Sequence, residues 1–542
     1  MQRARRADLS EALFDLIVIG GGITGAATAR DAALRGLSVL LVEKDDFAAG
    51  TSSRSSKLIH GGLRYLQTYQ FSLVAESLRE RERMLKLAPH LTEVRPFLYL
   101  LYDGYPEGRA LLNLGLTFYD AASGEWLKRR HHMLSADQVL EREPHLNPSG
   151  LRGAGQYFDV LTDDARLTVD HAKGAAEAGA QMLNHAAVTG LVLDHGRTRG
   201  VTITDQLDGA VFDVHARQVV SATGSWTDQT TAMETGQRSV KLRPTKGVHI
   251  VLRKSDFPLN TAVFLRSPDD NRVVWPIPSL EDDLVYIGTT DTDFTGDPDA
   301  VHPEEPDIRY LLNVANHTIP EARLTEDHIV GSWAGLRPLV ASAPGTSTSN
   351  TSREHVITTG PTGMLAISGG KLTSSRVMAK HLVDAALKAM QMPARTSHAE
   401  SVPISGGSPA AVSGFVPGAT AIGVPEDIAR SWQRRYGGNA HEILARWQRD
   451  VGSREVIGPR GLTVAEVQYC VDEEMCVTLR DLLVRRTSLF FWDAPGTLAS
   501  VERIAQVLGT LLGWEPAHRE AEVEAYRTLV LAHLPAAAQP RL

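Results

Sequence analysis

The chain has 542 residues, which is too many for one ordinary hydrophobic core and indicates two or three domains. Hydrophobic residues make up 43% and charged residues 22%, as in soluble globular proteins, and a net charge of -8 at pH 7 argues against a nucleic-acid partner. With 2 cysteines and no CxxCH motif, the sequence excludes an iron–sulfur cluster and an attached c-type haem.

No segment predicts a membrane-spanning helix or a signal peptide. The first apolar run, which starts at Phe14, is short and rich in glycine, and no apolar stretch of signal-peptide type precedes it. We therefore expect a cytoplasmic protein that at most lies on the membrane surface, on the cytoplasmic face of the inner membrane. The spacing of Cys470 and Cys476 fits neither CxxC nor a zinc site, and no metal site is predicted.

The N-terminal segment predicts a strand–helix–strand unit. Phe14–Ile19 is a short apolar run that suits a buried parallel strand, Thr24–Leu34 is alanine-rich with helical spacing, and Ser38–Val42 is a second apolar strand. This order is that of a βαβ unit, the building block of an α/β fold.

A dinucleotide-binding motif lies at the first turn of this unit. Gly20, Gly22 and Gly25 form GxGxxG between the strand and the helix, where a tight turn, a close pyrophosphate and close helix packing each require glycine. The helix N-terminus offers N–H groups to the phosphates. Glu43 ends the second strand, can accept a hydrogen bond from a ribose hydroxyl, and would repel a 2′-phosphate.

The stretch KLIHGGLRYLQ, residues 57–67, combines two glycines with functional side chains. Gly61 and Gly62 leave a bare backbone beside His60 and Arg64, which indicates that the main chain passes close to a ligand. Helical spacing follows from Phe71 to Leu91.

The second half of the chain predicts an antiparallel sheet and then a helical region. Short alternating stretches between Leu242 and Glu354 are separated by Pro, Asp and Gly, which favours antiparallel strands. Residues 392–418 are rich in Ser, Gly and Pro, as in a linker. Thr463 and Glu466 predict a capping box at the start of a helix.

Two further strand ends favour FAD over NAD. Val219–Asp228 contains Ala222 and Gly224 after a strand, and Met364–Ser375 contains Gly369 and Gly370 before a helix. A helix N-terminus that faces an isoalloxazine ring stabilises the anion formed when the flavin is reduced.

Five ordered blocks together resemble the FAD-dependent glycerol-3-phosphate dehydrogenases. They are GGGITGAATARDAALRG, TSSRSSKLIHGGLRYL, RPTKGVHIVL, WAGLRPL and GGKLTSSR, and the C-terminal EVQYCVDEEMCVTLRDLLVRRTSL resembles the helical cap of that family. The resemblance runs from about Phe14 to Trp514. It implies an α/β fold with a glutathione-reductase-like FAD-binding domain, an antiparallel substrate domain and a helical C-terminal domain.

Domain limits follow from this resemblance. A discontinuous FAD-binding domain is expected over about residues 1–90, 150–240 and 355–395, with an inserted substrate domain over about 91–149 and 241–354. A linker would cover 396–418 and a helical cap 419–542.

The resemblance also implies a reaction. It is the oxidation of sn-glycerol 3-phosphate to dihydroxyacetone phosphate by hydride transfer to flavin N5, with electrons passed to membrane quinone by a peripherally bound enzyme. Relatives that use oxygen often carry a central insertion, and this sequence shows no such segment. Oxygen as acceptor, an amine or amino-acid substrate on the same FAD fold, and a flavin-binding module without metabolic activity remain the alternatives. The sequence leaves the oligomeric state open, with a homodimer as one option.

Several residues acquire expected roles. A phosphorylated substrate calls for fixed cations, and arginine suits phosphate because its planar fork donates two hydrogen bonds. The resemblance places around the substrate the equivalents of Arg64, Tyr65, Arg337, Arg353 and Lys371. It adds as FAD contacts Thr51, Ser52, Ser53, Gly369, Gly370, Lys371, Leu372 and Thr373.

Two histidines are candidates for the base that takes the hydroxyl proton. They are His60 and His249, and Arg337 is the third catalytic candidate; the unperturbed pKa of histidine suits proton transfer near neutral pH. For membrane contact, the segment Leu482–Trp492 combines arginines with aromatic residues, although an apolar helix end packed inside the cap is the alternative.

Overall fold

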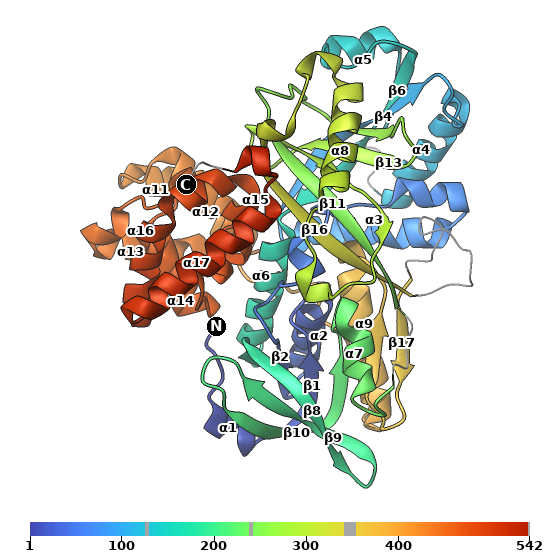
Figure 1. The fold of residues 1–542 in the computed structure, drawn as a ribbon. Helices are drawn as coiled ribbons and strands as arrows, with labels where there is room; N and C mark the ends of the chain where they lie inside the picture. The colour runs from blue at the N-terminus through green and yellow to red at the C-terminus, as the bar shows by residue number, and fades with distance from the viewer. Residues whose placement is uncertain (125–128, 238–241, 341–353, 540–542) are drawn as a thin grey trace.

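A computed structural model describes residues 1–124, 129–237, 242–340 and 354–539. Figure 1 shows three regions: an α/β region at the bottom, a second sheet region at the upper right, and a helical C-terminal region at the left. Helix α6, Asp164–Glu177, lies between the helical region and the rest of the molecule.

The α/β region is built on a sheet whose central strands are parallel. Its order is β17-β18-β10-β1-β2-β7, and the antiparallel strands β8 and β9 extend it from β10. The strands are β1 (Leu13–Ile19), β2 (Val39–Val42), β7 (Gln181–Leu183), β8 (Ala186–Asp194), β9 (Arg197–Asp205), β10 (Val211–Ser221), β17 (Val356–Thr359) and β18 (Leu365–Ser368).

Helices cover one face of this sheet, and apolar side chains of β8 and β9 contribute to the core on its other face. Helices α2 (Ile23–Leu34), α6 and α9 (Ser375–Ala389) pack together, and their alanine and leucine side chains form a core with the apolar strands. The predicted βαβ unit is therefore present with nearly the predicted limits. The chain leaves and re-enters this sheet, because its strands come from three separate parts of the sequence.

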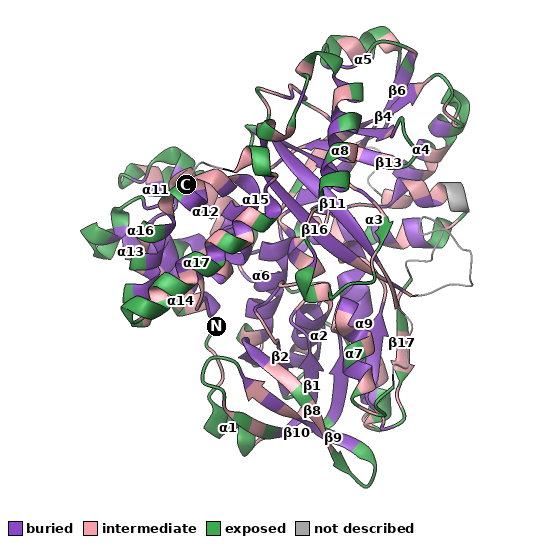
Figure 2. Cartoon of the chain, in the orientation of Figure 1, coloured by how far each residue is buried: buried purple, intermediate pink, exposed green. Residues whose placement is uncertain are grey.

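The second sheet is mainly antiparallel and has 10 strands. Its order is β15-β11-β14-β13-β12-β4-β6-β3, with β16 on β11 and β5 on β6. The strands are β3 (Leu58–Ile59), β4 (Thr92–Tyr102), β5 (His132–Leu134), β6 (Leu151–Thr162), β11 (Leu242–Arg253), β12 (Ala262–Arg266), β13 (Val273–Pro278), β14 (Leu284–Gly288), β15 (Thr292–Asp293) and β16 (Ile329–Val340). Figure 2 shows β11 and β16 as buried over most of their length.

Strand β6 belongs to this second sheet, although the sequence division at residue 150 assigns it to the FAD-binding part. It pairs with β4 from Thr162 to Leu151 and also with β3 and β5. Helices α3 (Phe71–Leu87) and α4 (Arg109–Ser123) pack beside it. Helix α3 ends before the predicted Leu91 because Pro89 disfavours helical backbone at Ala88, whose φ is -136°.

The C-terminal region is helical, as predicted. Its main helices are α11 (Phe415–Ala421), α12 (Glu426–Tyr436), α13 (Ala440–Arg449), α14 (Val464–Glu474), α15 (Leu489–Trp492), α16 (Ala494–Leu512) and α17 (Pro516–His533). Thr463 caps α14 by accepting from the Glu466 N–H at 3.2 Å. Glu466 does not complete the predicted capping box, because its carboxylate instead accepts from Arg435 and Tyr436 at 2.9 and 2.8 Å.

The segment Leu482–Trp492 is buried, so the alternative of an apolar segment packed inside the cap is confirmed. Arg485 and Arg486 are buried with it, and Phe490, Phe491 and Trp492 lie in the large C-terminal core. Within the described ranges, no helix combines the length and the apolar character that crossing a bilayer requires.

Candidate active site

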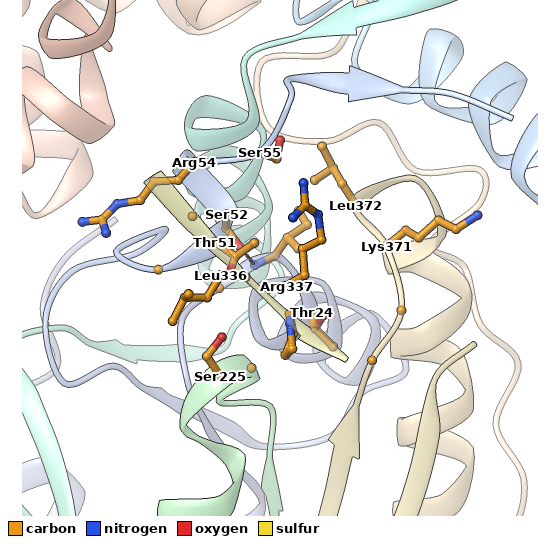
Figure 3. Close-up of a pocket in the computed structure, with 18 of the residues that line it drawn as sticks. Thr24, Thr51, Ser52, Arg54, Ser55, Ser225, Leu336, Arg337, Lys371 and Leu372 are labelled. Atoms are coloured by element: carbon orange, nitrogen blue, oxygen red, sulfur yellow. Dashed lines mark hydrogen bonds between the residues drawn. The ribbon is translucent and has the colours of Figure 1, made fainter. Parts of the chain in front are cut away.

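A cavity of about 450 Å³ joins the α/β region to the second sheet. The β1–α2 turn, the end of β2, the segment from Ala49 to Tyr65, the end of β10, strand β16 and residues 369–373 form its walls. Figure 3 shows part of this wall, with Arg54 and Lys371 at opposite sides of the labelled residues and Arg337 between them.

The glycine motif forms one wall of the cavity through close packing. Gly20 has a φ of 104°, and a Cβ there would lie 2.8 Å from the carbonyl oxygen of Ala222. Gly25 does not line the cavity; a Cβ on it would lie 1.8 Å from the Gly20 carbonyl oxygen, so it permits the close packing of α2 that the motif predicts. Gly22 and Gly224 line the cavity near this turn.

Glu43 lies at the end of β2 in the same wall. Its carboxylate accepts from the N–H of Gly21 at 2.6 Å and from the N–H of Asp45 at 2.9 Å. Burial raises the pKa of Glu43, and these two backbone hydrogen bonds oppose that shift. The side chain that was expected to bind ribose therefore also holds the turn that follows β2.

Two of the three residues from Thr51 to Ser53 face the cavity. The Thr51 hydroxyl donates to the Leu336 carbonyl oxygen at 2.6 Å, and Ser52 Oγ accepts from the Ile23 N–H at 2.9 Å. Ser53 is fully buried outside the cavity wall, and its hydroxyl donates to Gly50 within its own turn. The geometry thus places Ser53 away from a ligand in this cavity.

The two glycines after His60 serve different purposes. A Cβ on Gly61 would lie 2.5 Å from Leu78 Cδ2, and its N–H donates to the Tyr119 hydroxyl at 2.8 Å, so it packs against the core and not against the cavity. Gly62 lines the cavity with a φ of 74°, where a Cβ would collide with the Tyr65 ring.

A buried polar network holds the backbone at Gly61, whose N–H donates to the Tyr119 hydroxyl. The Tyr119 hydroxyl donates to Asp159 at 2.8 Å, and Arg81 donates to the same carboxylate at 2.9 Å. Burial raises the pKa of Asp159, although Arg81 opposes the shift. Asp159 lines the cavity, and the sequence carries no local motif that would have identified it.

Two of the predicted cations gather around one aromatic ring. The Lys371 ammonium lies 3.9 Å from the centroid of the Tyr65 ring, and the Arg64 guanidinium lies 5.9 Å from it. All three side chains line the cavity. This group, Arg64, Tyr65 and Lys371, comes from two segments about 300 residues apart in sequence that the fold brings together.

Arg337 lies on β16, where its strand neighbour on β11 is Thr245. Its guanidinium donates to Thr289 Oγ1 at 3.0 Å and to the Thr290 carbonyl oxygen at 3.2 Å, and it forms an ion pair with Asp291 at 3.2 Å. These contacts hold the guanidinium at the cavity wall.

The two candidate bases differ in their surroundings. His249 is buried, stacks on Trp333 with centroids 4.7 Å apart, and is hydrogen-bonded through Nε2 to Ser56 Oγ at 2.9 Å. Its Nδ1 is buried without a hydrogen-bond partner in the described part of the chain. Burial, followed by the charges of Arg337 and Lys57, holds the pKa of His249 well below its ordinary value, which keeps the ring neutral.

His60 is half-buried at the cavity wall. Its ring contacts Trp275 edge to face with centroids 5.7 Å apart, and its backbone N–H donates to Thr373 Oγ1 at 3.1 Å. This hydrogen bond links the segment after β3 to the segment before α9, where Gly369 and Gly370 have φ values of 78° and 85°. His60 therefore lies where these two segments meet at the cavity.

The cavity collects most of the predicted site residues. Those that line it are Gly20, Gly22, Glu43, Thr51, Ser52, His60, Gly62, Arg64, Tyr65, Ala222, Gly224, His249, Arg337, Gly369, Gly370, Lys371, Leu372 and Thr373. Gly25, Ser53 and Gly61 do not line it, and Arg353 lies outside the described residues. Five residues that were not predicted as site residues also line it: Arg54, Ser56, Asp159, Trp275 and Arg480.

Comparisons with known proteins agree with this architecture. Residues 15–385 match the family described as FAD dependent oxidoreductase, and residues 397–519 match the family described as the C-terminal domain of alpha-glycerophosphate oxidase. The junction between the matches lies close to the predicted start of the linker. The fold class predicted from the sequence is confirmed.

Similar proteins cover nearly the whole chain. The aerobic glycerol-3-phosphate dehydrogenase of Staphylococcus haemolyticus is 36% identical over 94% of this chain and 93% of its own length. That of Bacillus subtilis is 36% identical over 95% and 94%. The structure of glycerol-3-phosphate dehydrogenase from Bacillus halodurans complexed with FAD has a TM-score of 0.83 at 30% identity, over 99% of this chain and 98% of that one.

Proposed function

This chain belongs to the FAD-dependent oxidoreductases and, within them, to the aerobic glycerol-3-phosphate dehydrogenases, and from that premise we propose how its residues carry out the reaction and where the electrons go. The predicted cofactor, FAD, and the predicted enzyme class are confirmed.

The residues at the β1–α2 turn fit FAD. Gly22 is the N-cap residue of α2 and lines the cavity, so the helix N-terminus can offer N–H groups to a diphosphate there. Glu43 lies where a ribose hydroxyl can donate to it. Gly369 and Gly370 allow close approach of the backbone before α9. When bound, FAD supplies the acceptor for the hydride that leaves the alcohol carbon.

One observation carries the substrate assignment: Arg64, Lys371 and Arg337 line the same cavity as the nucleotide turn. A phosphate group needs several fixed donors of positive charge, whereas a carboxylate needs one arginine fork. Arg337 is oriented by Thr289 and Asp291, so its guanidinium requires little reordering when the substrate binds. In this proposal the three cations hold the phosphate of sn-glycerol 3-phosphate.

We assign the base to His60 and a positioning role to His249. The His249 ring lines the cavity, but its Nδ1 is buried and its Nε2 is bonded to Ser56 Oγ, so neither ring nitrogen can take a substrate proton while this hydrogen bond is kept. His60 borders the cavity directly. It would accept the proton of the substrate hydroxyl as the carbon–oxygen double bond of the product forms.

Two observations support a membrane quinone as acceptor. The sequence provides no second redox centre, so electrons must leave the flavin site directly. Beside the cavity, four large apolar side chains are exposed: Tyr69, Phe71, Leu111 and Leu114. Helix α4 packs on the cavity-lining segment Leu63–Thr68 through Gly115 and Leu66. We call these four residues the apolar patch and propose that it rests on the membrane, on the cytoplasmic face.

The reaction is tested by mixing the purified protein anaerobically with sn-glycerol 3-phosphate while the visible flavin spectrum is followed. We expect bleaching with this substrate and none with glycine. Retained yellow colour with both compounds would refute the substrate proposal, although FAD binding would stand.

The acceptor is tested by mixing substrate-reduced enzyme with a short-chain quinone or with oxygenated buffer. The proposal expects rapid reoxidation by quinone and slow formation of hydrogen peroxide. A fast peroxide burst would identify an oxidase, the activity named for the family that matches the C-terminal domain.

Membrane contact is tested by sedimentation with anionic phospholipid vesicles. Leu111→Glu combined with Leu114→Glu should abolish binding, because both side chains belong to the apolar patch. Leu193→Glu is the control, since Leu193 is also an exposed leucine but lies on β8 and does not line the cavity. Equal loss in both variants would argue against this patch.

A further inference from the structure

The turn after Glu43 is held by arginines of the C-terminal domain. Asp45 forms an ion pair with Arg485 at 3.1 Å, and Asp46 forms one with Arg486 at 2.5 Å. Arg486 also donates to the Glu474 carbonyl oxygen, which ties it to the end of α14. The segment Asp481–Arg486 is therefore attached to the nucleotide-binding edge of the α/β region.

A second set of contacts extends this attachment. His185 Nε2 lies 3.0 Å from Asp481 Oδ2, and Arg166 on α6 pairs with Glu474 at 2.6 Å. Asp45, His185 and Asp481 are close enough together to resemble a cation site. Arg485 already supplies positive charge to both aspartates, so ion pairing accounts for this cluster without a metal.

Arg480 extends from this attachment into the cavity wall. Its guanidinium lies 3.3 Å from Asp45 Oδ2, and its side chain remains 39% exposed. Arg480 lines the cavity beside Glu43, Lys44 and Asp45. Arg480, a residue of the C-terminal domain, thus borders the same cavity as the nucleotide-binding motif of the N-terminal βαβ unit.

Arg54 faces the same end of the cavity from the segment after Ser52. Figure 3 shows its side chain directed away from Arg337 and Lys371. In the described part of the chain no carboxylate forms an ion pair with it; Asp45 and Asp299 act on it at longer range. Burial, followed by the charges of Arg480 and Arg485, lowers the pKa of Arg54 to about 10, so it remains positive at neutral pH.

Arg480 shares Asp45 with Arg485, and the positive charges of both arginines act on Arg54, so an anionic ligand at this end of the cavity would stabilise all three guanidinium groups. The diphosphate of FAD is the anion that this end of the cavity is built to receive, because the N-terminus of α2 and Glu43 lie there. Arginine forks bind such oxygens through charge-assisted hydrogen bonds.

We propose that the C-terminal helical domain completes the FAD site: Arg480, together with Arg54, binds the diphosphate-and-ribose half of FAD, while Arg485 and Arg486 hold the Glu43 turn in position. FAD retention and docking of the C-terminal domain are then coupled, and each stabilises the other. The inference rests on FAD binding and is independent of the substrate.

The test measures how fast the full-length holoenzyme releases FAD on dilution, from the rise in free flavin fluorescence. Arg480→Ala and Arg54→Ala should each accelerate release about tenfold, as for the loss of one hydrogen bond to a charged group. Arg503→Ala is the matched control, because Arg503 pairs with Glu455 on the surface of the same domain. Release within twofold of the wild type in both cavity variants would overturn the proposal.

A second measurement keeps the test decisive if a variant folds poorly. In the wild type, rising potassium chloride should accelerate FAD release, since salt screens the contacts between arginine and diphosphate. Hydrogen exchange of the segment 480–486 should also slow when FAD is bound. A salt-independent release rate together with unchanged exchange would overturn the proposal, whatever the result of the bleaching experiment.

Discussion

The two ends of the cavity hold their charges in different ways. At the substrate end, Arg64 and Lys371 flank Tyr65, and Arg337 lies on a strand of the second sheet; all three cations are half-buried. At the nucleotide end, the aspartates after Glu43 are paired with buried arginines of another domain. The substrate end therefore gathers cations along the cavity wall, whereas the nucleotide end is held by ion pairs between domains.

This difference assigns separate consequences to mutations at each end. A mutation that removes a side chain at the substrate end should change turnover or substrate affinity and leave FAD in place. Losses at the nucleotide end should change FAD retention and stability and leave the intrinsic chemistry intact. If the two ends are independent, a mutation at one end should leave the properties of the other end unchanged.

The largest effect is expected at His60. His60→Asn removes the proposed base and should slow anaerobic flavin reduction by sn-glycerol 3-phosphate about 10²–10⁴-fold, with FAD content unchanged. Stopped-flow absorbance measures the rate. His249→Asn is the comparison, because His249 also lines the cavity but its Nε2 is already bonded to Ser56. If His60→Asn reacts at the wild-type rate while His249→Asn is slow, the two roles are exchanged.

The next largest effect belongs to the nucleotide end. Asp46→Ala removes the nearer carboxylate partner of the buried Arg486 and leaves Glu474, at 3.7 Å, as the more distant one; breaking a buried pair typically costs about 3–5 kcal/mol. We expect a lower apparent melting temperature and faster FAD loss, with normal rates of reduction in the FAD-bound fraction. Asp472→Ala, which breaks an exposed pair with Arg446, should change stability by less than about 1 kcal/mol. Equal melting temperatures in both variants would contradict a stabilising role for the ion pairs between the domains.

The features predicted correctly from the sequence are those encoded over short distances. The apolar run to Ile19, the glycines that follow it and Glu43 lie within 30 residues of one another, so local spacing specifies their geometry. The features that were missed depend on contacts between distant segments. Arg480 approaches Asp45 from a position 435 residues away, and no local pattern marks either residue for the cavity.

Two residues that fit a sequence pattern, Glu466 and Gly61, have a different role in the structure from the one predicted. Glu466 fits a capping box by spacing, yet Arg435 and Tyr436 compete for its carboxylate across the helical domain. Gly61 was expected beside the ligand, whereas Leu78 and Tyr119 occupy the space that its side chain would need. In both cases the residue type was informative, and a tertiary contact decided its role.

A smaller effect is expected from Arg337 at the substrate end. Arg337→Ala should lower kcat/KM for sn-glycerol 3-phosphate about 10–100-fold, mainly through KM, because charge-assisted hydrogen bonds to phosphate are lost. Arg337→Lys should recover part of the loss, since lysine keeps the charge without the fork. Arg243→Ala is the matched control on the neighbouring strand, where Arg243 pairs with Asp293 outside the cavity. Steady-state kinetics with an artificial acceptor measure these values.

The smallest effect concerns pH at the nucleotide end. Burial alone would lower the pKa of His185, but the Asp481 carboxylate and the nearby Asp46 and Asp45 raise it above its ordinary value of 6.5. Because the folded-state pKa is the higher one, the stability from the charged pair is fully present below about pH 6.5 and disappears as the pH rises through the folded-state value.

Wild-type protein should therefore lose about 1–2 °C more of its apparent melting temperature between about pH 6 and pH 9 than His185→Gln does. Arg485, which also pairs with Asp481, stays charged throughout this range and keeps the effect small, because it continues to neutralise the carboxylate when His185 loses its proton. If the melting temperatures of the two proteins change equally with pH across that range, His185 contributes nothing to the attachment between the domains. The interdomain attachment would then depend on its arginines alone.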